Sequence, residues 1–550
     1  MIYIIVAIVV VIAVVLFLRQ SQRARSRDAI DLLRVEWGKP KKGPFNFDSI
    51  GRYAEIGKVN VFHQLSLQTL QDIDFYELFA FVDRTTSKMG QQFLFDRLLR
   101  PTNSVDERME QNVELFTRNQ SLREEVQGEL IKLNSSTAYS ITSLLRDRSL
   151  IRPTWFSLAI ISAIVLAAML VLAFVYPVFL IFMVIPVTAN MLIHYWNRIN
   201  TLSFAASFSQ LSLLIDVSSK IEEKDILFEN NLVKQSVAAL RPFQWKMKLL
   251  AGTSEVGIKD ELGQIPAYFI EILKGFFLIE FFTLFQLVEE LEAKKETIRS
   301  LFNYTGSIDM AISVASLRAG SLKTCRPDFH TLEKEILVRK VYHPLIKDCA
   351  KNDLSIKGKS ILITGSNMSG KTTFLRTFAI NSILAQTINT CFADEFKSPM
   401  FKQFSSIRID DNLFEGKSYF FEEVNMIASF IREVEPTNQN LFILDEVFKG
   451  TNTRERIASA TAVLSYLNRN ANVVMVSTHD IELANLLKEE YDLYHFTDTI
   501  VNNQLFFDHK IKEGQLTTRN AIRILEISDY PADIIKEANR LSEQLGERNG

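Results

Sequence analysis

The first long apolar stretch of the chain covers residues 2–18 and contains no charged side chain. Only Met1 precedes it, and a cluster of arginines follows between Arg19 and Arg27. A run of about 17 apolar residues is at the short end of what crosses a bilayer. Positive charge after the run is typical of a retained anchor rather than a cleaved leader. We therefore expect a membrane anchor at residues 1–19, with the N-terminus outside and the basic segment 20–60 in the cytoplasm.

A second apolar block runs from Trp155 to Trp196 without one Asp, Glu, Lys or Arg, and Tyr176-Pro177 lies near its middle. Such a block is too long for one buried helix, and it predicts a hairpin of two spanning helices of about twenty residues each. Arginines flank both ends, which places both ends in the cytoplasm. These are Arg146, Arg148, Arg152 and Arg198. The sequence thus predicts a protein of the inner (cytoplasmic) membrane with three crossings.

A third apolar stretch, Ala267 to Leu291, is interrupted by Glu271, Lys274 and Glu280. Charges in the middle of a bilayer are costly, and a fourth crossing would also move the C-terminal half of the chain outside. We therefore expect this stretch to form a helix buried in protein.

Short apolar runs that end in polar loops dominate the C-terminal half. The first, "KSILITG", leads into a glycine-rich loop and then into the helical pattern "TTFLRTFAINSILAQ". The loop satisfies the pattern G-x-x-x-x-G-K-[ST], whose backbone N–H groups surround phosphate oxygens at a helix N-terminus. The residues expected to bind the phosphates of ATP are Gly365, Ser366, Asn367, Met368, Ser369, Gly370, Lys371, Thr372 and Thr373. Lys371 would neutralise phosphate charge, and the hydroxyl of Thr372 would bind Mg²⁺.

Two further runs supply the remaining chemistry. "NLFILDE" ends in Asp445 and Glu446, and "NVVMVSTHD" carries His479 near its end. The carboxyl ends of parallel strands meet at one edge of a sheet, where ligands bind. We expect Asp445 to hold Mg²⁺ and Glu446 to polarise the attacking water. His479 is expected to sense the γ-phosphate, and the alternative is a histidine with a structural role only.

Composition narrows the functional classes only slightly. The net charge of −2 gives no general argument for a polyanionic partner, and the 47% hydrophobic content reflects the local apolar runs. The three cysteines fit neither a disulfide framework nor a metal site, so we expect no disulfides.

Several of these motifs, in order and spacing, resemble the ATPase region of the MutS family of mismatch-repair proteins. They are "ITGSNMSGKTTFLRT", "KSYFFEEVNMIASFI", "LFILDEVFKGTNT" and "VSTHD", and "FVDRTTSKMGQQFLFDRLLRPTNSVDERMEQNVELF" resembles the start of that family's helical core. The resemblance implies an α/β P-loop ATPase domain with a mostly parallel sheet, preceded by an all-α MutS-core-like domain that the spanning helices interrupt. The domains expected are 61–150 and 197–335 for the two parts of the core, 155–196 for the hairpin, and 336–550 for the ATPase with C-terminal dimerising helices.

The resemblance also implies a homodimer whose ATP sites are shared between subunits. Ser418 and Thr451, the latter in the loop from Lys449 to Asn452, match stretches that the family presents to the neighbouring subunit's nucleotide. Glu423 matches a family carboxylate in a motif that is only half kept here.

DNA is a partner that the resemblance leaves open, because the chain departs from the family in two ways. The interval between the predicted anchor and the core leaves no room for mismatch-reading and connector domains. The string "IDFYELF" echoes the family's mismatch reader and would make Phe75 and Glu77 the readers, but its spacing is also that of an ordinary packed helix. The basic residues of the segment from Arg19 to Gly43 are explained by membrane topology and by attraction to anionic lipids.

The function expected is therefore that of a membrane-anchored MutS-like ATPase, in which ATP binding and hydrolysis switch the helical core. The alternatives are an ABC-type transporter-like or membrane-remodelling ATPase that does not act on DNA, and a scaffold without hydrolysis. No LSGGQ-type signature lies between Lys371 and Asp445, and all the residues needed for hydrolysis are present.

Overall fold

The computed structural model divides the chain into two compact units. The helical unit comprises residues 1–58, 82–96 and 106–319, and the sheet unit comprises residues 59–81, 97–105 and 320–550. The structure describes residues 28, 30–56, 61–146, 150–224, 226, 230–250, 272–329, 334–366, 368–408, 419–449, 451–501, 504–515, 525 and 530–547. The predicted anchor at residues 1–19 lies outside these residues.

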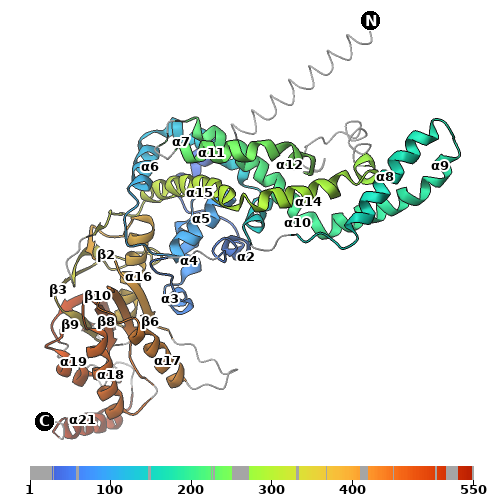
Figure 1. The fold of residues 1–550 in the computed structure, drawn as a ribbon. Coiled ribbons are helices and arrows are strands. Elements are labelled where there is room, and N and C mark those ends of the chain that lie inside the picture. The colour runs from blue at the N-terminus through green and yellow to red at the C-terminus, as the bar shows by residue number, and fades with distance from the viewer. Residues whose placement is uncertain are drawn as a thin grey trace. The chain divides into compact units, whose positions relative to one another are not determined.

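The described part of the helical unit is built from helices and short 3₁₀ turns (Figure 1). They are α2 (Phe47–Gly51), α5 (Lys88–Leu99), α6 (Glu107–Arg118), α7 (Gln120–Leu130), η1 (Ile131–Leu133), η2 (Ser136–Leu145), α8 (Phe156–Ala173), α9 (Phe179–Phe182), α10 (Val184–Glu222), α11 (Asn230–Leu240), η3 (Arg241–Phe243), α12 (Gln244–Leu250), α14 (Ile279–Glu292) and α15 (Lys295–Arg318). Side-chain caps fix several helix starts, as where Asp106 accepts the N–H of Met109 and Asn119 accepts the N–H of Leu122. The last three residues of α5 belong to the sheet unit.

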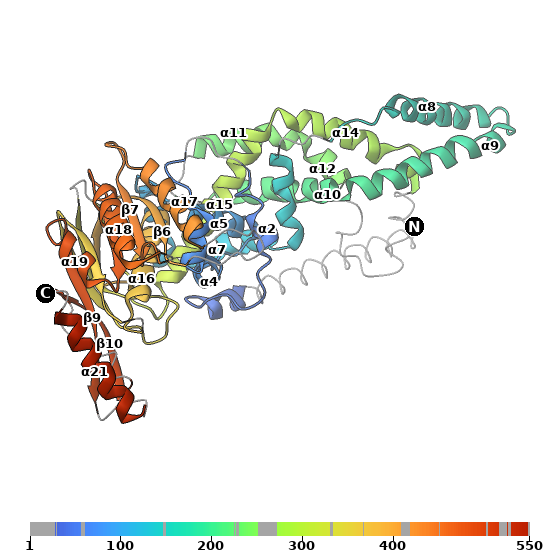
Figure 2. The same cartoon turned by 90° about the horizontal axis from the view of Figure 1, so that it is seen from below.

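The predicted apolar hairpin is present in the helical unit as α8, α9 and the first half of α10, and it extends from the rest of the bundle (Figures 1 and 2). Among the described residues, two segments are long and apolar enough to cross a membrane, Phe156–Ala173 and Phe179–Asn200. Only 11% of each is buried in protein, unlike the core helix of a soluble domain. Where the hairpin joins the bundle, the rings of Trp155 and Trp196 pack together, with their centroids 5.0 Å apart. Length and composition thus agree with two of the three predicted crossings.

Helix α10 continues without a break from this hairpin into the core of the helical unit. Further along the helix, the side chains of Phe208, Leu211 and Leu214 are fully buried. The same helix is therefore exposed and apolar at one end and a core helix at the other.

The third apolar stretch behaves as expected of a helix buried in protein. Phe281, Leu284 and Leu287 on α14 are almost fully buried. The ammonium group of Lys274 donates to the backbone oxygen of Leu249 at 3.0 Å and lies 3.2 Å from a carboxylate oxygen of Glu280. The charges that interrupt the apolar run are therefore satisfied within the protein. Glu271 lies outside the described residues.

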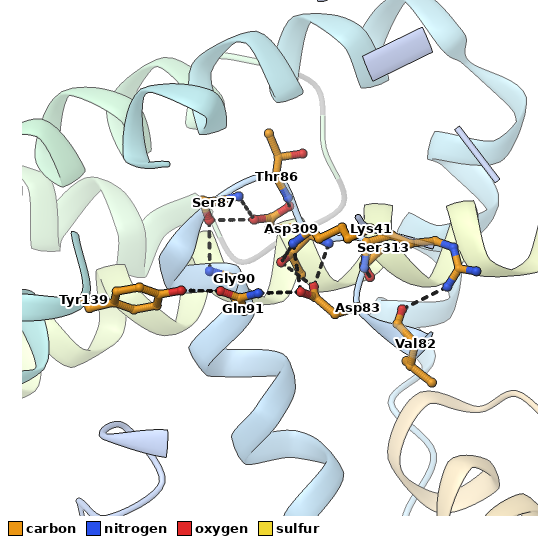
Figure 3. A network of polar contacts seen from close by, with 12 residues as sticks. Lys41, Val82, Asp83, Thr86, Ser87, Gly90, Gln91, Tyr139, Asp309 and Ser313 are labelled. Carbon is orange, nitrogen blue, oxygen red and sulfur yellow. Dashed lines mark hydrogen bonds and ion pairs between the residues drawn. The ribbon is translucent and has the colours of Figure 1, made fainter. Parts of the chain in front are cut away.

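A buried polar network fixes the start of α5 in the helical unit (Figure 3). The carboxylate of Asp309, on α15, accepts the backbone N–H groups of Thr86 and Ser87, each at 2.7 Å, and the hydroxyl of Ser87 at 2.6 Å. A side chain on Gly90 would collide with this carboxylate, so only glycine permits so close an approach. The residues of the stretch "DRTTSKMG" therefore have a structural role in this network.

The basic segment before the core makes specific contacts within the helical unit. Arg34 pairs with Glu124 at 2.6 Å, and Lys41 pairs with the buried Asp83 at 2.9 Å. The guanidinium of Arg123 lies 3.7 Å from the ring centre of Trp37. Sequence reasoning assigned these cations to topology and lipid attraction, whereas Arg34 and Lys41 also attach the segment to the protein.

The sheet unit contains a six-stranded sheet in the order β10-β9-β4-β8-β7-β6 and a four-stranded sheet in the order β1-β5-β2-β3. In the larger sheet only β9 and β10 pair antiparallel, so the sheet is mostly parallel, as predicted. The strands are β1 (Asp328–Phe329), β2 (Glu335–Val341), β3 (Asn352–Lys357), β4 (Ser360–Thr364), β5 (Glu395–Ser398), β6 (Lys402–Ser406), β7 (Asn440–Asp445), β8 (Val473–Thr478), β9 (Tyr491–Val501) and β10 (Gln504–Glu513).

Helices cover both faces of the larger sheet, which is the layered arrangement of an α/β fold. On one face, Leu362, Phe442 and Val474 pack with apolar residues of α17, α18 and α19. Helix α16 packs on β6, β7 and β8, and the alternation of side chains along strands assigns it to the opposite face. The helices of the unit are α3 (Leu67–Asp72), α4 (Phe75–Val82), α16 (Lys371–Ile388), α17 (Tyr419–Arg432), α18 (Thr453–Leu467), α19 (Ile481–Leu487) and α21 (Ala532–Glu547). The last residue of α4 belongs to the helical unit.

The string "IDFYELF" forms part of this sheet unit rather than a separate reading domain. Phe75 is 1% exposed on α4, and Glu77 is exposed. Just before it, the carboxylate of Asp72 accepts the backbone N–H groups of Ile407 and Arg408 at the end of β6. A buried Phe75 cannot act as an exposed wedge, so the packed-helix interpretation fits these contacts.

Candidate nucleotide site

The glycine-rich loop connects β4 to α16 in the sheet unit. Gly365 and Gly370 have φ angles of +148° and +111°, a region that residues with a side chain rarely adopt. A Cβ atom at Gly365 would lie 2.9 Å from both the backbone oxygen of Phe496 and the hydroxyl of Ser369. Both glycines are thus required by the backbone path, which ends at the N-terminus of an 18-residue helix. Such a terminus favours anions.

The other residues of the loop occupy different environments. Ser369 is buried and donates its hydroxyl to the backbone oxygen of Ser366 at 2.7 Å. Met368 is 72% exposed, and Thr373 lies in the first turn of α16. Asn367 lies outside the described residues. The loop is therefore held by its own hydrogen bonds.

Lys371 is 3% exposed and lies inside the loop. Its ammonium group donates to the backbone oxygens of Gly365 at 2.6 Å and Ser366 at 2.9 Å. Burial lowers the pKa of Lys371 to about 8, and Asp445 opposes this shift. The charge of Lys371 is thus placed at the loop in a partly desolvated setting, where its effect on an anion is strongest.

Thr372 and Asp445 meet across the ends of α16 and β7. The hydroxyl of Thr372 donates to Asp445 Oδ2 at 2.6 Å, and the hydroxyl of Ser477, on β8, donates to Asp445 Oδ1. A hydroxyl and a carboxylate are the hard oxygen ligands that Mg²⁺ prefers. The two predicted magnesium ligands are therefore adjacent, and their chemistry fits the ion.

Glu446 lies between two nitrogen groups. Its carboxylate oxygens are 2.6 Å from His479 Nε2 and 2.7 Å from Lys449 Nζ. Burial lowers the pKa of His479, and the nearby charge of Lys371 lowers it further, which favours the neutral ring. Neutral His479 then donates its Nε2–H to Glu446. The structure thus brings Lys371, Thr372, Asp445, Glu446 and His479 together.

One residue at the loop was missed by sequence reasoning. His509, on β10, donates from Nδ1 to the backbone oxygen of Ser369 at 3.0 Å, and a Cβ atom on Gly370 would lie 3.2 Å from that nitrogen. No local pattern around "FFDHK" indicates this contact, because it joins residues far apart in the chain.

Two residues, Ser418 and Thr451, are expected to act on a partner subunit, and the structure describes only Thr451. Ser418 lies outside the described residues, as does Gly450, which precedes Thr451. Thr451 is half-buried directly before α18, whose N-cap Asn452 accepts the N–H of Glu455 at 3.1 Å. The role of Thr451 at a partner's nucleotide stays a prediction.

A glycine-rich loop between a strand and a helix of a mostly parallel sheet is typical of the P-loop class of proteins. A family model described as MutS domain V matches residues 361–546, which contain all the site residues above. The C-terminal part of the chain is therefore similar to proteins of the MutS family.

Curated relatives carry the name DNA mismatch repair protein MutS. The protein from Listeria monocytogenes is 35% identical over 222 residues, which is 39% of this chain and 25% of that protein. The protein from Pseudothermotoga lettingae is 30% identical over 276 residues, 48% of this chain and 33% of the relative. The protein from Oceanobacillus iheyensis is 27% identical over 331 residues, 57% of this chain and 37% of the relative. The chain thus spans about a quarter to a third of the length of these relatives.

Proposed function

We propose that this protein is an ATPase that hydrolyses ATP with Mg²⁺ at the site in its sheet unit. The observation that supports this proposal is the convergence of Lys371, Thr372, Asp445, Glu446 and His479 at one edge of the sheet. Each has the chemistry that phosphoryl transfer to water requires, and no other set in the described chain combines a phosphate-binding loop with a paired carboxylate.

The position of each residue indicates its role in the proposed reaction. Lys371 and the N-terminus of α16 bind and neutralise phosphate oxygens. Thr372 and Asp445 would hold Mg²⁺, which when bound supplies positive charge beside the phosphates. Glu446 accepts hydrogen bonds and orients the attacking water, and His479 keeps Glu446 in place through its Nε2–H.

The protein is proposed to act as a homodimer. Helix α21 supports this, because its apolar side chains recur at helical spacing and are exposed: Ile534 is 48% exposed and Leu541 is 44% exposed. An amphipathic helix with an exposed apolar face is a suitable dimer contact. In the dimer, Ser418 and Thr451 are proposed to reach the partner's nucleotide.

The proposed location is the cytoplasmic membrane, with both units in the cytoplasm. The exposed apolar hairpin supports this proposal, as do the paired tryptophans at its base, since such residues favour the membrane interface. Separation of cell membranes from soluble protein tests it directly. Extraction by high salt or carbonate, without detergent, would contradict an integral hairpin.

The names of the relatives suggest a role in DNA mismatch repair, and we propose association with DNA as the family-style function. The second candidate is a membrane-remodelling or transporter-like ATPase that does not act on DNA. The continuity of α10 favours this candidate, because a segment that enters lipid cannot also close around a duplex.

Two measurements test these proposals. The first is ATP turnover by the full-length protein in detergent, with Mg²⁺ or with EDTA; turnover that is equal in both would contradict the magnesium site. The second is binding to matched and mismatched duplexes over a salt series. A preference for mismatches would support the repair function, and no binding at low salt would favour the second candidate.

A further inference from the structure

The chain makes an unusual turn directly after β7. Glu446 and Phe448 have φ angles of +56° and +63°, and neither is a glycine. The left-handed region costs a residue with a side chain roughly 1–2 kcal/mol. Two such residues within three positions require surrounding contacts that stabilise this conformation. The first of the two, Glu446, is the residue that would orient the attacking water.

A buried carboxylate on another element provides such a contact. Glu423, on α17, is 1% exposed, and its Oε1 accepts the backbone N–H of Phe448. The ring of Phe448 is 6% exposed and packs with Phe420 at a centroid distance of 6.1 Å. The turn is thus held twice by α17, through a hydrogen bond to the backbone and through packing of the ring.

A carboxylate is a costly choice for this position if stability alone is considered. Burial raises the pKa of Glu423, and the backbone N–H groups of Phe448 and Lys449 oppose that shift. Ile427 and Phe430, which follow at helical spacing on the same face of α17, are apolar and buried, and an apolar side chain at position 423 would desolvate no charge. The carboxylate supplies a hydrogen-bond acceptor for the backbone of the turn.

We propose that Glu423 is a positioning residue for Glu446. By holding the N–H of Phe448, it fixes the left-handed turn that directs the Glu446 carboxylate between His479 Nε2 and Lys449 Nζ. Its hydrogen bond is to the backbone of the turn, and it is through this backbone that it acts on the reaction. This inference rests on the proposed ATPase function and assigns it a residue outside the phosphate loop and the strand ends.

Three variants and a control separate this role from a general contribution to folding. Glu423→Ala removes the acceptor, Glu423→Gln keeps an acceptor oxygen without the charge, and Glu423→Asp keeps the charge on a shorter side chain. Glu422→Gln is the matched control, because it removes one charge from the adjacent, partly exposed position of the same helix. The measurements are kcat and KM for ATP, the affinity for a fluorescent ATP analogue, and hydrogen exchange of the backbone at residues 446–449.

Misplacement of a catalytic group by about 1 Å costs on the order of 100-fold in rate, so we expect Glu423→Ala to lower kcat by roughly 30- to 100-fold. KM and analogue affinity should stay within about 3-fold, because the phosphate-binding residues are unchanged. Glu423→Gln should recover most of the rate, Glu423→Asp should fall between the two, and Glu422→Gln should match the wild type. Protection of the turn from exchange should follow the same order.

A wild-type kcat for Glu423→Ala would overturn the proposal. Equal losses in Glu423→Ala and Glu423→Gln, in step with a lower thermal midpoint, would overturn it too, because stability would then explain both. The exchange measurement does not depend on turnover. If the wild-type protein hydrolysed no ATP, the proposed function would fail, and unchanged protection in Glu423→Ala would still decide against the positioning role.

Discussion

Two clusters of carboxylates, one in each unit, use similar side chains in different ways. In the helical unit, Asp309 and Asp83 lie among a lysine, threonine and serine hydroxyls and backbone N–H groups at the start of α5 (Figure 3). In the sheet unit, Asp445 and Glu446 lie among lysines, hydroxyls and a histidine at the ends of β7 and β8. Composition alone would not tell the two clusters apart.

Geometry distinguishes them. Asp309 accepts three hydrogen bonds from one short stretch, and the backbone around it is unstrained: none of residues 83–90 has a positive φ angle. At the sheet edge, Gly365, Gly370, Glu446 and Phe448 all have positive φ angles. Backbone strain concentrates at functional sites. We therefore infer a structural role for the first cluster, and the strain supports the catalytic role proposed for the second.

The largest expected effect comes from Glu446→Gln. Removing the carboxylate that orients water should lower kcat by about 100-fold or more, while ATP affinity should change by less than about 3-fold. Single-turnover hydrolysis and binding of a fluorescent ATP analogue measure the two quantities separately. Undiminished hydrolysis would remove Glu446 from its proposed role and would weaken the contrast between the clusters.

The next effect is on affinity. Lys371→Ala removes the buried ammonium group at the loop, and we expect ATP affinity to fall by about 10- to 100-fold, as for the loss of a charged contact of about 1.5–3 kcal/mol. Equilibrium binding in the presence of Mg²⁺ measures this. Lys357→Ala is a suitable control, because it removes an exposed lysine from β3 of the same unit. Equal affinity for Lys371→Ala and the wild type would contradict the phosphate site.

The helical cluster should respond in stability rather than in chemistry. Asp309→Ala leaves the buried N–H groups of Thr86 and Ser87 without an acceptor, and we expect a loss of roughly 3 kcal/mol in unfolding free energy. Thermal or denaturant unfolding of the full chain measures this loss, and nucleotide affinity of the folded variant should match the wild type. A large change in ATP affinity at unchanged stability would reverse the assignment of the two clusters.

Local patterns predicted the parts of the molecule that depend on residues close in sequence. The strand–loop–helix around Gly365 and the strand ends at Asp445 and His479 follow from apolar runs that stop at polar residues, and the structure places them as expected. The hairpin from Trp155 to Trp196 follows from length and the lack of charge. These features need no knowledge of the tertiary fold.

Contacts between distant residues explain what the sequence did not reveal. His509 reaches the loop from β10, and Lys41 reaches Asp83. Glu423 was noted only as a family carboxylate, since nothing in "SYFFEEV" shows that its side chain meets Phe448. Such pairings depend on how strands and helices are arranged in space, and hydrophobic periodicity carries no information about them.

The smallest expected effect is a pH dependence of stability. Burial raises the pKa of Asp309 to about 6, above its ordinary value of 3.8, while Ser87 and Thr86 oppose the shift. The folded state therefore binds more protons than the unfolded state between these values, so this group's contribution to stability is full below about pH 4 and is lost as the pH rises through about 6. Asp309→Asn cannot titrate. The thermal midpoint of the wild type should therefore fall relative to that of Asp309→Asn as the pH rises from 4 to 6. Above pH 7 the difference between the two midpoints should stay constant. Parallel profiles across this range would show that Asp309 is ionised throughout and would contradict its raised pKa.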